Sequence, residues 1–253
     1  MRKLFFLWLF IAASFLANGQ GNTLYTVNFV KPKAQMKSAF EAAWKSHLAK
    51  FHNTTDKRTV YEVMSGPNMG TYHIVEGPIS YADMDKEKPN GKEHGMDLEK
   101  NIFNMVESSS NATYRWDDTA SFNGKVEANK FMVTVTHVKF GQIGETIRES
   151  RRGALIQAKI NPTSRFSANM YTQMWAGSNP VRVQIRNLKD GFKELENNYY
   201  GPSTTPANAF KDAYIKDYGQ EAWDTRSKLF DNNANVASRE IFLTKLRKDL
   251  SSK

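Results

Sequence analysis

The chain has 253 residues, of which 40% are hydrophobic and 12% aromatic, and it contains no cysteine. This composition is typical of a globular protein with a sizeable core and excludes a disordered chain. The lack of cysteine excludes disulfide bonds, thiolate metal sites and cysteine nucleophiles. The formal net charge is +9, but the basic residues are dispersed, so we expect no nucleic acid as a partner.

The N-terminal residues have the pattern of a secretory signal peptide. Arg2 and Lys3 precede an apolar run over residues 4–16, and small residues follow up to Gly19. This pattern predicts a cleaved signal peptide at 1–19 and export to the periplasm or the medium. A retained membrane anchor is the alternative, but the apolar run is shorter than the roughly 20 residues that span a bilayer. We therefore expect no membrane span in the mature protein.

Two pairs of similar segments indicate an internal repeat. Residues 27–31 (VNFVK) align with 135–139 (VTHVK), and residues 61–64 (YEVM) align with 171–174 (YTQM), at nearly equal offsets. Repeats of this kind indicate a duplicated unit. We predict a first repeat over 20–122, a linker over 123–129 and a second repeat over 130–253.

Periodicity predicts the same order of elements in both halves. Alternating apolar and polar residues predict strands, apolar residues at helical spacing predict helices, and proline or glycine marks their ends. In the first half the predicted elements are a strand at 24–30 that ends at Pro32, a helix at 35–51, strands at 59–64 and 71–75, a helix at 97–107 and a strand at 112–121. In the second half they are a strand at 131–140, a helix at 143–159, strands at 169–175 and 181–185, helical segments within 207–229 and a strand at 239–246.

The order βαββαβ gives a ferredoxin-like sheet with both helices on one face, and its other face needs a cover. Two fused copies supply that cover for each other. The chain thus resembles the dimeric α+β barrel superfamily, with both protomers in one polypeptide. The expected fold class is α+β, with tandem ferredoxin-like repeats that form an intramolecular barrel and a pseudo-dimer within one chain. Members of that superfamily include cofactor-free monooxygenases, haem-degrading enzymes and chlorite dismutase-like haem proteins.

The resemblance implies a ligand cleft between the sheet and its helices. We expect the strand face with Tyr25, Val27 and Phe29 to line it in the first half, and the face with His137 in the second. His137 is either a haem ligand or acid–base group, or a core histidine with satisfied ring nitrogens. The helical stripe at 35–51 adds further candidates. The predicted ligand-binding residues are His137, His47, Trp44, Tyr25, Asn28, Tyr171 and Trp175.

Cofactor chemistry has little support in the sequence. Asn28 and Trp175 match single members of the residue set of haem-degrading relatives, but neither half holds the full set. Haem therefore remains a possible cofactor only through the resemblance. We expect no metal site, because the five histidines are far apart in sequence and show no zinc-binding spacing.

Three classes of function stay open. We predict an exported protein that binds a small apolar or aromatic molecule in a sheet–helix cleft. A cofactor-free or haem-dependent monooxygenase-type enzyme is the first alternative. A cell-envelope interaction protein, using the aromatic residues near 199–200 and 214–223, is the second. The mismatch between Phe29 and His137 at equivalent positions further predicts that the halves have diverged, one for function and one for packing.

Overall fold

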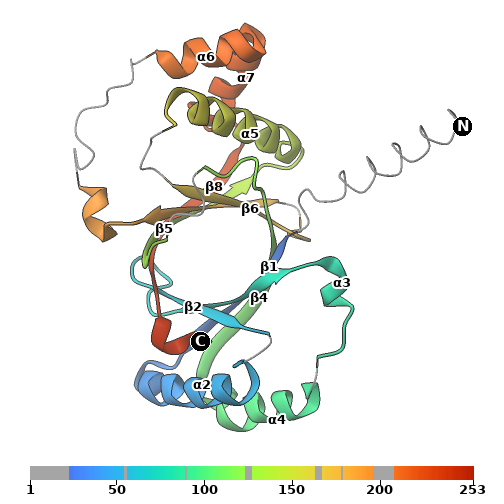
Figure 1. The fold of residues 1–253 in the computed structure, drawn as a ribbon, viewed down its shortest axis with the longest axis vertical. Coiled ribbons are helices and arrows are strands. Elements are labelled where there is room, and N and C mark those ends of the chain that lie inside the picture. The colour runs from blue at the N-terminus through green and yellow to red at the C-terminus, as the bar shows by residue number, and fades with distance from the viewer. Residues whose placement is uncertain are drawn as a thin grey trace, which may run out of the picture.

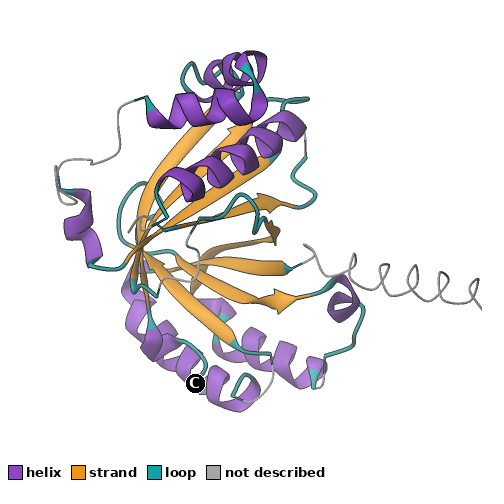
Figure 2. Ribbon diagram, turned by 45° about the horizontal axis from the view of Figure 1, so that its top comes forward, coloured by secondary structure: helices purple, strands orange, loops and turns teal. Residues whose placement is uncertain are grey.

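The computed structural model describes residues 23–53, 56–88, 90–122, 127–162, 167–177, 179–196 and 208–253. Its eight strands form a closed barrel in the order β1-β3-β2-β8-β5-β7-β6-β4. Every strand is antiparallel to both of its neighbours. The helices lie outside the barrel, in one group on each side (Figures 1 and 2). The predicted signal peptide lies outside the described residues.

Each half of the chain supplies four adjacent strands and the helices that cover them. The first half consists of β1 (Leu24–Pro32), α2 (Lys37–Phe51), β2 (Arg58–Val63), β3 (Tyr72–Ile79), α3 (Tyr81–Met84), α4 (Gly91–Asn101) and β4 (Val106–Trp116). The second half consists of β5 (Lys130–Val138), α5 (Ile143–Ile160), β6 (Ala168–Gln173), β7 (Val181–Leu188), α6 (Ala209–Tyr218), α7 (Gln220–Phe230) and β8 (Val236–Leu246). Short 3-10 turns lie at Ala34–Met36, Phe103–Met105, Gly191–Leu195 and Lys248–Leu250.

Both halves have the strand order of a ferredoxin-like sheet. The first runs β4-β1-β3-β2 and the second runs β8-β5-β7-β6. The predicted α+β architecture of two ferredoxin-like units is confirmed at this level. That the halves arose by duplication, and the exact limits of the repeats and the linker, stay predictions. No helix within the described residues is long and apolar enough to span a membrane.

The barrel closes where the edges of the two sheets pair. β2 pairs with β8 through Tyr61 and Leu246, and β4 pairs with β6 through Trp116 and Tyr171, among other register partners. A closed barrel has no free strand edge, and edges are where sheets add unwanted partners. Closure therefore gives each sheet a cover for its second face and removes all of its exposed edges.

Two predicted elements are displaced, the second helix of the first half and the strand after it, which was expected at 112–121 and is β4 at Val106–Trp116. The helix expected at 97–107 is α4 at Gly91–Asn101, and residues from Val106 onward already belong to β4. No residue of α4 is fully buried, so its first turns carry no apolar periodicity by which they could be recognised. Ile102 and Met105, which the prediction placed in the helix, pack in the core just after it.

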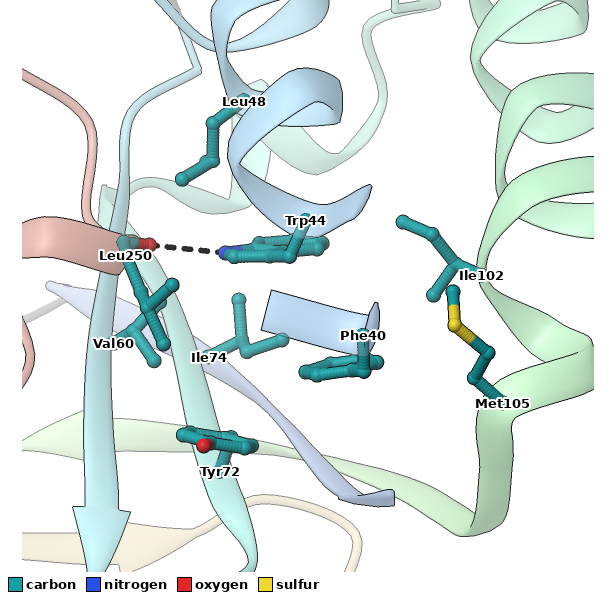
Figure 3. Close-up of a cluster of buried hydrophobic side chains, with 9 residues drawn as sticks. All are labelled: Phe40, Trp44, Leu48, Val60, Tyr72, Ile74, Ile102, Met105 and Leu250. Atoms are coloured by element: carbon teal, nitrogen blue, oxygen red, sulfur yellow. Dashed lines mark hydrogen bonds between the residues drawn. The ribbon is translucent and has the colours of Figure 1, made fainter. Parts of the chain in front are cut away.

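The space between sheet and helices in the first half is filled by a hydrophobic core. Figure 3 shows how side chains from α2, β2 and β3 interlock there with Ile102, Met105 and Leu250. Trp44 donates a hydrogen bond from Nε1 to the carbonyl oxygen of Leu250 at 2.9 Å. The full core comprises Phe40, Trp44, Leu48, Val60, Tyr72, Ile74, Ile102, Met105 and Leu250. This half is thus closed at the place where the family resemblance put a cleft.

The C-terminal residues fasten the second half onto the first. Leu250 is fully buried in the first-half core. Arg247, which directly follows β8, donates hydrogen bonds to Glu41 on α2 at 2.8 Å and to Glu62 on β2 at 2.9 Å. Hydrogen bonds between ionised partners are stronger than neutral ones. These contacts of the C-terminal residues therefore stabilise the pairing of β2 with β8 on the outer side of the barrel.

The filled core predicts a large cost for truncation. We expect Phe40→Ala to lower the free energy of unfolding by about 3–5 kcal/mol, because it removes a fully buried ring from a packed site. The matched control is Phe103→Ala, since Phe103 is 57% exposed and should change stability by only about 0.5 kcal/mol. Denaturant unfolding measures both. Equal small effects would show that the first half is not tightly packed.

Candidate functional site

A cavity of about 630 Å³ lies in the second half, between the outer face of its sheet and helices α5, α6 and α7. Strand residues such as Thr134 and Gln184 form its floor and residues of the three helices form its roof; Figure 1 shows these helices on the outer side of the second-half strands. Residues that define it include Thr134, Thr136, Arg182, Gln184, Gly153 and Phe210. It occupies the place that corresponds to the filled core of the first half.

Small side chains on α5 leave this space open. Ser150, Gly153 and Ala154 line the cavity, whereas α2 places Phe40 and Trp44 in the first-half core. A Cβ atom at Gly153 would lie 3.8 Å from Arg226 Nε and 3.8 Å from Phe210 Cζ. The backbone of α5 therefore approaches α6 and α7 closely while the region below stays free.

Arg182 on β7 is the most distinctive residue of the cavity wall. Its side chain is buried, and Nη1 donates to Thr172 Oγ1 at 2.7 Å and to Asp117 Oδ2 at 3.2 Å. The remaining edge, Nε and Nη2, has no hydrogen-bond partner. Burial lowers the pKa of this guanidinium, and the nearby Asp117 carboxylate opposes that effect. Nε and Nη2 form the pair of parallel donors that binds a carboxylate in two-point fashion.

Two more cavity residues have unsatisfied polar atoms. Asn235 donates from Nδ2 to Thr146 Oγ1 at 2.9 Å, and Thr146 in turn donates to the carbonyl oxygen of Gln142. This chain fixes the amide orientation and leaves Asn235 Oδ1 as a buried acceptor without a donor. Arg226 Nε likewise has no partner, while its guanidinium packs 4.7 Å from the centre of the Phe210 ring.

Glu149, a fully buried carboxylate at the cavity wall, already has hydrogen-bond donors for its oxygens. Glu149 accepts hydrogen bonds from Tyr214 Oη, from Arg152 Nη1 at 2.8 Å and from Arg148 Nε at 3.2 Å. Burial and the bond to Glu149 raise the pKa of Tyr214. Tyr214 is itself buried, so it is not part of the exposed aromatic surface that the sequence predicted. The polar atoms of the wall that lack a partner are therefore mainly arginine donors, on Arg182 and Arg226.

A second cavity, of about 350 Å³, lies inside the barrel and is mainly apolar and aromatic. Tyr25 and Tyr171 meet edge to face across it, with ring centres 5.6 Å apart. His73 lies between Phe29 and Phe242, with ring centres 4.8 and 5.7 Å away. Burial lowers the pKa of His73 to about 4. This interior is an aromatic chamber with one neutral imidazole.

The structure separates the residues that the sequence grouped in a sheet–helix cleft. Tyr25 and Tyr171 line the barrel interior instead, so the predicted orientation of these strand faces is wrong. The apolar face of each sheet turns into the barrel, and in the second half the more polar face turns toward the helices. His137 shares the barrel side of β5 with Val133 and Val135 and lines neither of the two cavities.

The other predicted site residues are also dispersed. Trp44 and His47 are buried in the first half beneath α2. Asn28 is the register partner of Ile74 and Asn111, on the face of β1 opposite Val27. Trp175 is 70% exposed just after β6. Their roles in ligand binding stay predictions, and none of them lines the second-half cavity.

The polar strand residues that line the cavity were not predicted from the sequence. Arg182 and Gln184 alternate with Val181, Val183 and Ile185 along β7. A strand that should be covered by helices has no obvious need for an arginine on that face. A charge at such a covered position was the available signal for a site.

No family model and no curated protein matches the sequence. Among solved structures, the chain is similar to a candidate monooxygenase from Lactobacillus acidophilus, at 9% identity and a TM-score of 0.52 over 91% of this chain and 96% of that one. It is similar to the chlorite dismutase of Candidatus Nitrospira defluvii, at 5% identity and a TM-score of 0.51 over 91% and 93% of the two chains. A candidate monooxygenase from Fusobacterium nucleatum gives 13% identity and a TM-score of 0.50 over 89% and 92%. The chain has the fold of the dimeric α+β barrel superfamily, which confirms the resemblance at the level of fold.

Haem is the cofactor that the family resemblance left open, and the second-half cavity does not fit a histidine-ligated haem. Haem iron is held by histidine, cysteine, tyrosine or methionine. All five histidines are described, and none of them lines this cavity: His47, His52 and His94 belong to the first half, His73 to the barrel interior and His137 to the barrel side of β5. The chain has no cysteine.

This mismatch predicts the result of a haem titration. We expect hemin added to the purified protein to give the same absorption spectrum with the wild type and with His137→Ala, because His137 lies outside the cavity. Optical titration in the Soret region measures this. A Soret band that shifts with the wild type and disappears in His137→Ala would contradict the assignment.

The barrel interior predicts acid sensitivity. The pKa of His73 is about 4 in the folded protein and about 6.5 when unfolded, so the unfolded state binds more protons between these values. Stability is therefore lost as the pH falls from about 6.5 toward 4. We expect His73→Leu to lose less unfolding free energy than the wild type between pH 7 and pH 4.5 in denaturant titrations. Equal losses in the two proteins would show that His73 is not held neutral.

Proposed function

We propose that this protein binds a small anionic molecule with an apolar or aromatic body in the second-half cavity. The observation that carries the proposal is the buried edge of Arg182, where two parallel N–H donors have no partner. A carboxylate or a related planar anion supplies two acceptors at the matching spacing. Of the function classes that the sequence left open, this proposal selects small-molecule binding and adds a preference for a negatively charged ligand.

The energetic argument rests on the cost of unpaired buried donors. A buried polar group without a partner costs about 1–3 kcal/mol, and charged groups cost more. Asp117 compensates only one nitrogen of Arg182, at 3.2 Å. An anion at the free edge would restore hydrogen bonds to both remaining nitrogens. The cost is thereby recovered on binding, which favours a charged ligand over a neutral one of the same shape.

The rest of the wall supports an apolar ligand body. Phe210, Phe230 and Ile241 line the cavity and provide surfaces for an aromatic or aliphatic group. Asn235 Oδ1 offers an acceptor for a hydroxyl or amine of the ligand. A small-molecule site of this kind combines apolar surfaces for the ligand body with fixed polar groups that orient it.

A catalytic role is the alternative, since two structural neighbours are candidate monooxygenases. Their low identity supports the fold alone. The cavity wall has no histidine, and its buried carboxylate, Glu149, is fully engaged with Tyr214, Arg148 and Arg152. Binding without chemistry is therefore the function we propose. Export, which the N-terminal residues predict, would make this a binding protein outside the cytoplasm.

The test compares two ligands that differ in charge. We expect 2-naphthoate to bind the full chain more tightly than 2-naphthylmethanol, by about 10- to 150-fold for charge-assisted hydrogen bonds. Isothermal titration measures both affinities. In Arg182→Lys the cation beside Asp117 remains but the two-point edge is lost, so the preference for the acid should largely disappear. Arg115→Lys is the matched control, because Arg115 is a partly buried arginine that does not line the cavity.

A second variant tests whether the ligands bind in the second-half cavity. Gly153→Leu extends a side chain from α5 against Phe210 and Arg226, which both line the cavity, and it should block both ligands while the protein stays folded, as judged by circular dichroism. A preference for the acid that persists in Arg182→Lys would refute the role of Arg182. Undiminished binding to Gly153→Leu would place the ligand in the barrel interior or elsewhere.

A further inference from the structure

Three histidines of the first half converge at the ends of α2 and α4. His47 lies on α2, His52 follows the last residue of α2, and His94 lies on α4. His94 Nε2 lies 3.1 Å from His47 Nε2 and 3.2 Å from His52 Nε2. The three ligand atoms lie within 4.8 Å of one another. His47 and His52 are each only 1% exposed.

Hydrogen bonding between the rings alone leaves this cluster unsatisfied. Each imidazole nitrogen carries either one proton or one lone pair. His94 Nε2 can therefore make a good hydrogen bond to His47 or to His52, but not to both. The other contact then has no hydrogen between its two nitrogen atoms, and such an unpaired contact in a buried site is unfavourable. An additional group at the centre of the cluster would remove this conflict.

The outer nitrogens of two rings are already fixed by acceptors. His47 Nδ1 lies 2.8 Å from Asp97 Oδ2, and His52 Nδ1 lies 2.9 Å from the carbonyl oxygen of Asp56. A carbonyl oxygen and an ionised carboxylate only accept, so both Nδ1 atoms donate. In the neutral rings each Nε2 then presents a lone pair toward His94. Hydrogen bonds from Nδ1 to a carboxylate or carbonyl are the usual outer support of metal-binding histidines.

We propose that His47, His52 and His94 form a binding site for a divalent transition-metal ion of the zinc class, with all three Nε2 atoms as ligands. Nitrogens bound tetrahedrally to zinc at 2.0–2.1 Å lie about 3.3 Å apart. The two contacts of His94, at 3.1 and 3.2 Å, are close to that spacing. A single ion would replace the conflicting ring contacts with three bonds to lone pairs.

The surroundings are compatible with a cation. The carboxylate of Asp97 lies 2.8 Å from Nδ1 of His47 and places a negative charge next to the site. Arg58 is engaged by Asp56 at 2.6 Å and by Glu76 at 3.0 Å, so its charge is largely balanced. His94 is only partly buried, which gives an ion a path from solvent. Three protein ligands leave a fourth position for water or an anion.

This site is independent of the proposed ligand cavity. It lies in the first half, next to the filled core, and shares no residue with the cavity of the second half. The sequence predicted no metal site because none of the usual short zinc spacings occurs. The ligands come instead from a His-x4-His pair at the end of α2 and from His94 on α4.

The test is zinc binding by the full chain after treatment with a chelator. We expect one Zn²⁺ per chain in a competition titration with a chromophoric chelator, and visible absorption bands of tetrahedral Co²⁺ when cobalt replaces zinc. His94→Ala should abolish the cobalt bands and weaken zinc binding strongly. Asp97→Asn, which alters only the support of His47, should weaken zinc binding by about 10- to 100-fold. His137→Ala is the matched control and should bind zinc like the wild type.

A readout on the unaltered protein guards against variants that fail to fold. Zinc should shift the imidazole NMR signals of His47, His52 and His94 and leave those of His73 and His137 in place. Zinc should also raise the melting temperature of the wild type, because it binds the folded state. Absence of zinc binding to the wild type, or shifts confined to His73 or His137, would overturn the proposal. Unchanged zinc affinity in folded His94→Ala would overturn it as well.

Discussion

The edges of the two four-stranded sheets pair with each other, β2 with β8 and β4 with β6, and the remaining features of the molecule depend on this closure. A ferredoxin-like sheet has helices on one face only. Closure turns the bare faces of both sheets toward each other and lines the interior cavity with aromatic rings. The outer faces then need only their own helices, so each half can change what lies beneath its helices without opening the barrel.

The two halves differ in what lies between the sheet and its helices. In the first half, Phe40 and Trp44 of α2 fill the space against the sheet, and Leu250 from the end of the chain completes the packing. In the second half, Gly153 and Ala154 of α5 leave a cavity, and the strands beneath it carry Arg182. The divergence predicted from the Phe29 and His137 mismatch has a counterpart here, but in other residues. A solid half supports the barrel, and the half with the cavity is the one we propose to bind a ligand.

Periodicity and element order were enough to predict the strands, most helices and the paired ferredoxin-like sheets, because those depend on local alternation. The face that each strand turns inward could not be predicted in this way. Tyr25 and Tyr171 were expected beneath helices and lie inside the barrel, since both faces of such a sheet are covered. The cluster of His47, His52 and His94 depends on how α2 and α4 pack, which no single segment encodes. Arg182 was visible in the sequence, but its unpaired edge depends on where Asp117 and Thr172 lie in three dimensions.

The central claim is that the cavity of the second half binds an anion at Arg182, whereas the corresponding space of the first half is filled by a core. A crystal structure of the full chain grown with 2-naphthoate tests this claim most directly. Our account predicts electron density for the naphthalene ring beneath α5, with both carboxylate oxygens within hydrogen-bond distance of Nε and Nη2 of Arg182. A cavity filled by side chains, or a ligand seated only inside the barrel, would contradict it.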